Sequence, residues 1–157
     1  MILRIRTILD VDDDVIRDIE IEEQNSLNDL YIFISKSYGF DGKEMGSFFE
    51  SDENWIQGKE LNLVDFEAKS NYSNSPLNKI FDNKKRHLIF VYDFLALWTF
   101  YVEVIEFTEP LKNGVYPNTV FSKGKPPENP PTKSFNDSHK SNQTDHEGLN
   151  YDEDEFY

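Results

Sequence analysis

The sequence contains no cysteine, and this absence excludes several kinds of site. Without a thiol the chain has no disulfide framework, no thiolate nucleophile and no cysteine ligand for a metal ion. Histidine is also scarce, because only His87, His139 and His146 are present, and they lack the spacing of metal ligands. We therefore expect no metal site, no cofactor and no catalytic residue, and we interpret the protein as a non-enzyme.

Basic residues are few relative to acidic ones. Sixteen Lys and Arg residues stand against thirty Asp and Glu residues, which gives a formal net charge of −14 at pH 7. A surface with this charge repels nucleic acid and anionic lipid, and it attracts positively charged proteins. Recombinases need clustered arginines around the reacting phosphate, whereas this chain has four arginines, three of them in the first predicted hairpin. Direct nucleic-acid binding and recombinase activity are therefore not expected.

No hydrophobic run is long and uncharged enough for a transmembrane helix. The most apolar stretch, residues 87–107, contains Asp93, Glu103 and Glu106, and each charge costs about 2.5–3.5 kcal/mol near the centre of a bilayer. Its Val, Ile, Phe and Tyr residues favour strands instead. An acidic cluster also precedes any segment with the length of a signal-peptide core. The sequence thus predicts a cytoplasmic protein without membrane association.

The N-terminal part of the chain has the clearest local pattern. Residues 2–9 are rich in β-branched and apolar types, and residues 15–22 alternate between apolar and charged types, which predicts two strands of a hairpin. The acidic residues between the strands, 10–14, fit a solvated turn, because they lack the Gly and distal Glu of a calcium loop. A helix is predicted next, with Ser26 as its N-cap, apolar residues every three or four positions and Gly39 at its end.

The rest of the chain divides into further strands and a tail. Strands are predicted at residues 45–51, 87–92, 99–107 and 119–122, and a single helical turn at 76–81. Residues 87–92 are apolar at both alternating positions, so this strand should be covered on both faces. From about residue 124 the composition changes to Pro, Ser, Asn and acidic types, which cannot form a core. We therefore predict a compact α+β domain over 1–124 and a Pro-rich, then acidic, disordered tail over 125–157.

The order of the predicted elements resembles a β-grasp, the ubiquitin-like layout, in which a mixed sheet packs against one main helix. Residues 92–100, Tyr-Asp-Phe-Leu-Ala-Leu-Trp-Thr-Phe, resemble the pattern Tyr-Asp-Phe-Gly-Asp-x-Trp-x-His. This pattern belongs to the family named after the third open reading frame of an Agrobacterium Ri plasmid, which is also labelled an insertion-element passenger protein of TnpR type. The hairpin, the helix and the Pro-Pro-Glu of residues 126–128 are placed as in that family.

The resemblance covers roughly residues 2–130, but the motif is degenerate here. Leu95 and Ala96 replace the family's Gly-Asp, and Phe100 replaces its His, so polar chemistry at those positions is not carried over. Tyr92, Asp93 and Trp98 match the pattern without bringing an established role. The region from Phe40-Asp41-Gly42 to Trp55 is similar to family members common in Bacteroidetes.

Two features are candidates for partner binding. The first is the connection between strands 87–92 and 99–107, where Phe94, Leu95, Leu97 and Trp98 occupy a place that usually has Gly, Asn or Asp. These side chains either fold back into the core or form an exposed apolar patch, and patches of that kind mark interfaces. The sequence leaves both alternatives open.

The second candidate is the end of the tail, where aromatic residues bracket acidic ones. The segment consists of Tyr151, Asp152, Glu153, Asp154, Glu155, Phe156 and Tyr157. Its carboxylates can pair with Lys or Arg of a partner while its rings anchor in pockets. A tail that only increased solubility would need no aromatic residues, although that simpler role stays open.

These features together predict a non-enzymatic adaptor. An acidic-aromatic tail and an apolar loop would bind a basic surface of a larger nucleic-acid-handling assembly, of the polymerase or ribosome type, or the tail would mimic nucleic acid in its groove. One alternative is an accessory protein of a mobile element that takes part in DNA transactions, as the family label implies. Another is an enzyme whose site is assembled from residues that are distant in the sequence.

Overall fold

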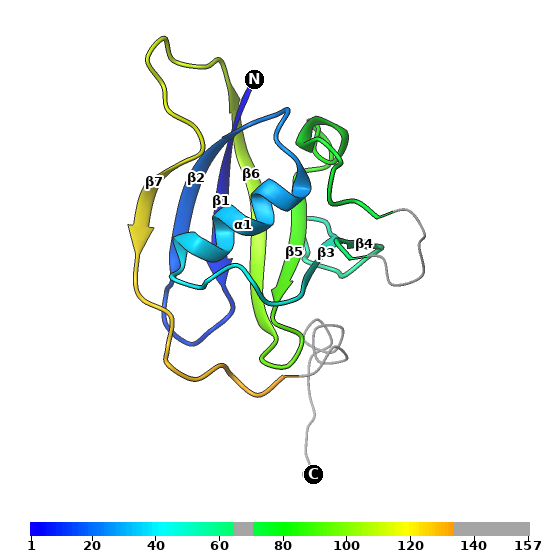
Figure 1. Ribbon diagram of the computed structural model, residues 1–157, viewed down its shortest axis with the longest axis vertical. Helices are drawn as coiled ribbons and strands as arrows, with labels where there is room; N and C mark the ends of the chain where they lie inside the picture. The colour runs from blue at the N-terminus through cyan, green and yellow to red at the C-terminus, as the bar shows by residue number, and fades with distance from the viewer. Residues whose placement is uncertain (65–70, 134–157) are drawn as a thin grey trace.

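The computed structural model describes residues 1–64 and 71–133 of the chain. These residues form one seven-stranded sheet with an α-helix across one face (Figure 1). The elements in chain order are β1 (Ile2–Leu9), β2 (Ile16–Glu22), α1 (Leu27–Ser37), β3 (Gly46–Glu50), β4 (Glu60–Asn62), the 3₁₀ turn η1 (Leu77–Lys79), β5 (His87–Tyr92), β6 (Trp98–Thr108) and β7 (Asn118–Lys123). Of the tail predicted over residues 125–157, residues 134–157 lie outside the described part of the chain, and residues 125–133 are described and have no helix or strand.

The predicted α+β class with one main helix is confirmed, but the sheet is not mixed. Its strand order is β4-β3-β5-β6-β1-β2-β7, and every pairing between the described strands is antiparallel. A β-grasp would need a parallel pair, whereas β1 is antiparallel to both of its neighbours, β2 and β6. The order of elements along the chain is compatible with either arrangement, because it does not specify which strands pair.

The predicted strands and the helical turn are all present, and β4 is an additional strand. β4 has three residues and pairs with β3, with Leu61 opposite Phe48. A three-residue strand with one apolar side chain shows no alternation, and therefore its sequence gives no periodic signal.

The helix begins at a capping box and buries one apolar stripe. The Ser26 hydroxyl accepts a hydrogen bond from the Asp29 N–H (3.0 Å), and the Asp29 carboxylate accepts one from the Ser26 N–H (2.9 Å). Gly39 follows the helix with φ of +88°, a left-handed conformation that glycine adopts without strain. The buried side chains of the stripe are Leu27, Leu30, Tyr31, Ile34 and Tyr38. No helix of the described chain is long and apolar enough to cross a membrane.

Beneath the helix, β5 is the strand that packs on both faces, as predicted. Its side chains alternate, so that Leu88, Phe90 and Tyr92 point toward α1 and Ile89 and Val91 point to the opposite face, and all five are buried. The Phe90 ring stacks between two other phenylalanines, with centroid distances of 4.6 Å to Phe48 and 5.3 Å to Phe100. These aromatic contacts between neighbouring strands form the centre of the core.

One charged residue, Arg17 of β2, lies on the face that packs against α1. Its guanidinium donates to the backbone carbonyls of Ser37, Ile16 and Lys123 at 2.9–3.0 Å and lies over the Tyr38 ring. The side chain is buried, and these carbonyls satisfy donors that burial would otherwise leave unpaired. Arg17 thereby connects the C-terminal end of α1 to the sheet edge formed by β2 and β7.

The capping box generates a testable prediction about acid stability. We expect Ser26→Ala to lower the free energy of unfolding at pH 7 by about 1 kcal/mol, because it removes the N-cap acceptor. The hydrogen bond from the Ser26 N–H lowers the pKa of Asp29 below its usual 3.8, so its stabilising effect is present above that pH and is lost as the pH falls. Asp29→Asn should therefore destabilise the protein at pH 7 and much less at pH 3 in urea unfolding followed by circular dichroism. An equal loss at both pH values would contradict this account.

Candidate interaction surface

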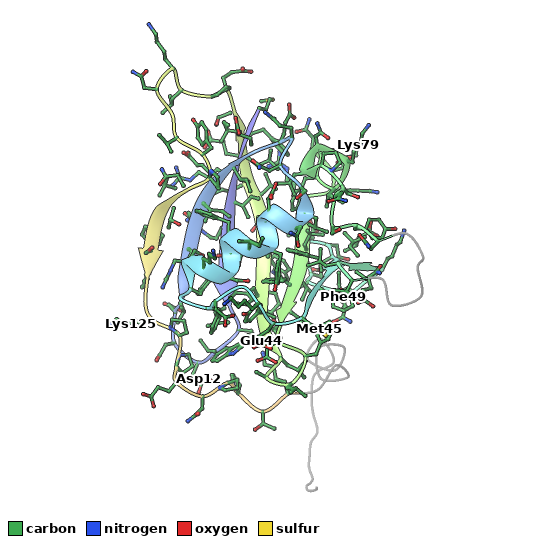
Figure 2. All side chains as sticks on the ribbon, viewed as in Figure 1. Asp12, Glu44, Met45, Phe49, Lys79 and Lys125 are labelled. Atoms are coloured by element: carbon green, nitrogen blue, oxygen red, sulfur yellow. The ribbon has the colours of Figure 1, made fainter. Side chains whose placement is uncertain are left out.

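Several connections between the elements meet at one end of the molecule, the lower end in Figure 1. We call this region the loop end. It consists of the β1–β2 loop (10–15), the α1–β3 loop (38–45), the β5–β6 loop (93–97) and the segment 124–133. Asp12, Glu44 and Lys125 mark it in Figure 2.

The β5–β6 loop is a tight turn organised by Asp93. The Asp93 carboxylate accepts hydrogen bonds from the N–H groups of Leu95 (3.0 Å) and Ala96 (3.3 Å), and its carbonyl accepts one from Leu97 N–H. Asp93 and Leu97 both have positive φ, at 68° and 57°. Asp tolerates this conformation better than most residues, whereas Leu pays a steric cost. The turn therefore has one conformation that its hydrogen bonds specify.

The sequence left open whether the apolar residues of this turn fold back into the core or form an exposed patch, and both outcomes occur. Leu97 and Trp98 are buried, at 8% and 7% exposure, and lie on opposite faces of the sheet. Phe94 is half-buried against the cluster that contains Leu97. Leu95, by contrast, is 98% exposed. Leu97 and Trp98 thus anchor a turn that carries a fully exposed leucine at its tip.

The family-type residues around this turn make structural contacts. The Tyr92 hydroxyl donates to the Asp41 carboxylate (2.8 Å) and accepts from the Gly42 N–H (3.1 Å), which fastens the α1–β3 loop to the sheet. The hydrogen bond from Tyr92 lowers the pKa of Asp41. Trp98 packs against Phe40, at 5.1 Å between ring centroids. Phe100, where the family pattern has His, is completely buried in the aromatic core.

The turn is surrounded by acidic loops. The β1–β2 loop contains four carboxylates, the α1–β3 loop two and the β5–β6 loop one, and these three loops contain one basic residue, Lys43. Some of these carboxylates are engaged, since Asp93 organises its own turn and Asp14 lies 3.3 Å from the Lys123 ammonium group. Asp12, Asp13 and Glu44 are exposed. The loop end therefore combines an apolar tip with a negative surrounding surface.

An aromatic cluster that the sequence did not single out lies on the far face, which we define as the sheet face opposite α1. The Trp55 ring packs against His87 of β5 at 4.9 Å and against Tyr101 of β6 at 5.1 Å. Trp55 has φ of 60°, which is unusual for a large side chain and identifies a locally strained backbone. Trp55 belongs to an irregular loop between β3 and β4. The sequence around it therefore has no periodic pattern that predicts packing against the sheet.

Charged pairs cover another part of the far face. Arg6 makes a bidentate ion pair with Asp18, with both N···O distances at 2.8 Å, and Asp18 is buried beneath it. The hydrogen bonds that Arg6 donates to the Asp18 carboxylate raise the pKa of Arg6. His87 lies 3.4 Å from the Glu103 carboxylate. These polar contacts run along the strands on a face where no helix of the described chain packs.

At the junction of the far face and the loop end, the segment 124–133 is attached through Lys133. Its ammonium group donates to the Asp10 carboxylate and to the Asp10 carbonyl (3.2 Å). The Tyr101 hydroxyl donates to the same carboxylate at 3.3 Å. Burial, and then the charge of Asp10, raises the pKa of Tyr101 to about 12, so the phenol stays protonated as a donor. Asp10 therefore binds two groups from distant parts of the chain, the Lys133 ammonium group and the Tyr101 hydroxyl.

The remaining predicted residues are placed as follows. The tail segment Tyr151, Asp152, Glu153, Asp154, Glu155, Phe156 and Tyr157 lies outside the described residues. Within residues 1–64 and 71–133, no three His, Asp or Glu side chains are grouped so that they could hold a metal ion. The acidic residues 10–14 form the turn between β1 and β2, as expected, although Asp10 itself is engaged by Lys133 and Tyr101.

Comparison with known proteins connects this architecture to one family. The profile of the plasmid pRiA4b ORF-3-like proteins matches residues 2–147. No curated protein sequence matches the chain. Among solved structures, a protein of unknown function from Methanosarcina mazei Go1, MM3350, superposes with a TM-score of 0.69 at 15% identity, covering 81% of this chain and 72% of that chain. This likeness supports a shared fold.

Alanine substitution can test whether Leu97 belongs to the core while Leu95 does not. We expect Leu97→Ala to lower the free energy of unfolding by about 2–5 kcal/mol, because it leaves a cavity in a buried cluster. Leu95→Ala should change it by less than about 0.5 kcal/mol, since the side chain already lies in water. Urea denaturation of the two variants measures both values, and similar losses for the two would show that Leu95 is also part of the core.

Proposed function

This chain belongs to the plasmid pRiA4b ORF-3-like family, and we propose that it works as a non-enzymatic adaptor whose loop end docks on a basic surface of another protein. The partner that fits this chemistry is a larger nucleic-acid-handling assembly, of the polymerase or ribosome type, because such assemblies present extended cationic surfaces. The exposed tip of the β5–β6 loop is the observation that carries the proposal.

Leu95 supports docking through both its exposure and its rigidity. Burying a leucine side chain in a partner contributes about 1.5–3 kcal/mol, and here the whole side chain is available. The Asp93 hydrogen bonds and the buried Leu97 already fix the turn. Little conformational entropy is therefore lost when the turn binds, and this preorganisation favours affinity.

The charges around Leu95 favour a cationic partner. Carboxylates surround the apolar tip in three loops, so a partner with Lys or Arg around a small apolar pocket complements it. We include the tail segment 151–157 in the proposed contact on the basis of its composition, with carboxylates for ion pairs and three aromatic rings as anchors. Leu97 and Trp98 contribute by positioning the turn.

We expect Leu95→Asp to reduce capture of the partner at least about tenfold in affinity purification from the cell of origin, quantified by mass spectrometry. The substitution removes the apolar contact and adds a charge of the sign that the surface already carries. Val115→Asp is the matched control, because Val115 is also exposed, at 75%, in the β6–β7 connection at the opposite end of the molecule. Equal losses for the two variants would overturn the proposal.

A truncation after residue 133 tests the tail separately while retaining the Lys133 contact. It should weaken capture, and raising the salt concentration from about 0.1 M to about 1 M, which shortens the Debye length from about 10 Å to about 3 Å, should weaken it further. Capture that is insensitive to both changes would refute an electrostatic contact. Direct binding of DNA that persists at moderate salt would instead support an accessory role in DNA transactions.

A further inference from the structure

The Lys133 side chain occupies a small site that is built from three elements. Although it belongs to a segment without regular secondary structure, its side chain is only 19% exposed. Its ammonium group bonds to a carboxylate oxygen and to the backbone carbonyl of the same residue, Asp10. Most surface lysines extend into water, so this degree of burial and pairing is unusual.

The site around the ammonium group is preorganised. The Asp10 N–H donates to the Thr99 carbonyl at 2.8 Å, which fixes its backbone against β6. The Tyr101 hydroxyl donates to the Asp10 carboxylate (3.3 Å) and orients it. Tyr101 is in turn packed by Trp55, with ring centroids 5.1 Å apart. The result is a carboxylate and a carbonyl oxygen held in place together, an arrangement of acceptors that is suited to an ammonium group.

We propose that Asp10 and Tyr101 form a binding site for the ammonium group of a lysine on the partner protein, and that Lys133 occupies this site in the free protein. The inference rests on the proposed docking of the loop end on a basic surface, and it names one contact in that complex. The site lies at the junction of the loop end and the far face, and the β1–β2 loop that begins with Asp10 is part of the loop end.

The internal contact is suitable for exchange because it is weak. Partly exposed ion pairs contribute little, so we expect the occupied and vacant forms to differ in population by a ratio on the order of five to one. A free lysine must compete with a tethered Lys133, whose effective concentration is high. A lysine on a partner already held by Leu95 has a similar advantage, and it can therefore displace Lys133.

The first experiment uses no partner. Full-length Lys133→Ala protein, labelled with ¹⁵N, is titrated with Nα-acetyl-lysine amide, and the backbone amides of Asp10, Val11 and Tyr101 are followed by NMR. We expect these amides to shift in a saturable way, with an apparent affinity about fivefold or more higher than in the wild type, where Lys133 competes. The probe acetylated at Nε, which has no charge, should leave them unchanged.

Two further variants separate a specific site from general attraction to an acidic protein. Asp10→Asn in the Lys133→Ala background should abolish the saturable shifts, whereas Asp13→Asn in the same background should preserve them, because Asp13 is an exposed carboxylate of the same loop that takes no part in the site. Equal responses of the two double variants, or no response of Lys133→Ala at these amides, would overturn the inference.

The Lys133→Ala variant also tests whether the lysine site takes part in partner binding. If a partner lysine displaces Lys133, Lys133→Ala should increase partner capture about fivefold, and adding Asp10→Asn should remove this gain. Unchanged capture by Lys133→Ala would refute the exchange. The lysine titration does not depend on Leu95, so it tests the site separately from the adaptor surface. If Leu95→Asp leaves capture intact but the titration shows saturable binding, the proposed adaptor surface is refuted and the lysine site is retained.

Discussion

The two faces of the sheet are not equally covered, and the rest of the architecture follows from this constraint. Within the described residues, one eleven-residue helix packs on seven strands. On the helix side the strands have a continuous apolar surface, which the stripe of α1 and the stacked rings of Phe48, Phe90 and Phe100 fill. On the far face residues 1–64 and 71–133 form no second layer, so bare apolar side chains of these strands would be exposed to water there. The chain instead places the Arg6–Asp18 pair, in which Asp18 is buried beneath a partly exposed Arg6, over one region of that face and the Trp55 loop over another.

The same constraint explains why the distinctive residues of this protein are in loops. Two segments from outside the sheet reach the far face. The Trp55 loop is fixed there by contact with Tyr101, and segment 124–133 is fixed by the bond from Lys133 to Asp10, which is itself hydrogen-bonded to Tyr101. Trp55, Asp93 and Leu97 all have positive φ without being glycine. Such conformations persist only where surrounding contacts specify them, and these three residues flank the surface that carries Leu95 and the lysine site.

The sequence was sufficient for features that depend on neighbouring residues and insufficient for those that depend on distant ones. The β1–β2 hairpin, the Ser26 cap and the two-sided strand β5 each have a local pattern, and each is present as predicted. The antiparallel pairing of β1 with β6 joins segments that are far apart in the chain, and no local pattern specifies it. The β5–β6 loop was ambiguous for a related reason. Residues 94–98 are all apolar and look alike in sequence, whereas positive φ at Asp93 and Leu97 directs Leu97 inward and Leu95 outward. The contact between Lys133 and Asp10 also spans most of the chain, and a lysine in a Pro-rich segment gives no signal of it.

The position of Lys133 in the sequence gives its contact a further significance. The residues that follow it, 134–157, contain seven acidic residues and one lysine, and Lys133 itself bonds to a loop that has four carboxylates. A chain with this excess of negative charge repels itself, and this repulsion opposes contacts that make the chain more compact. A cationic partner at the loop end would relieve that repulsion at the same time as it supplies a competing lysine. The two effects therefore oppose each other: the geometry of Asp10 makes the Lys133 contact stable enough to form in isolation, and the negative charge of the chain makes it weak enough for a basic surface to replace.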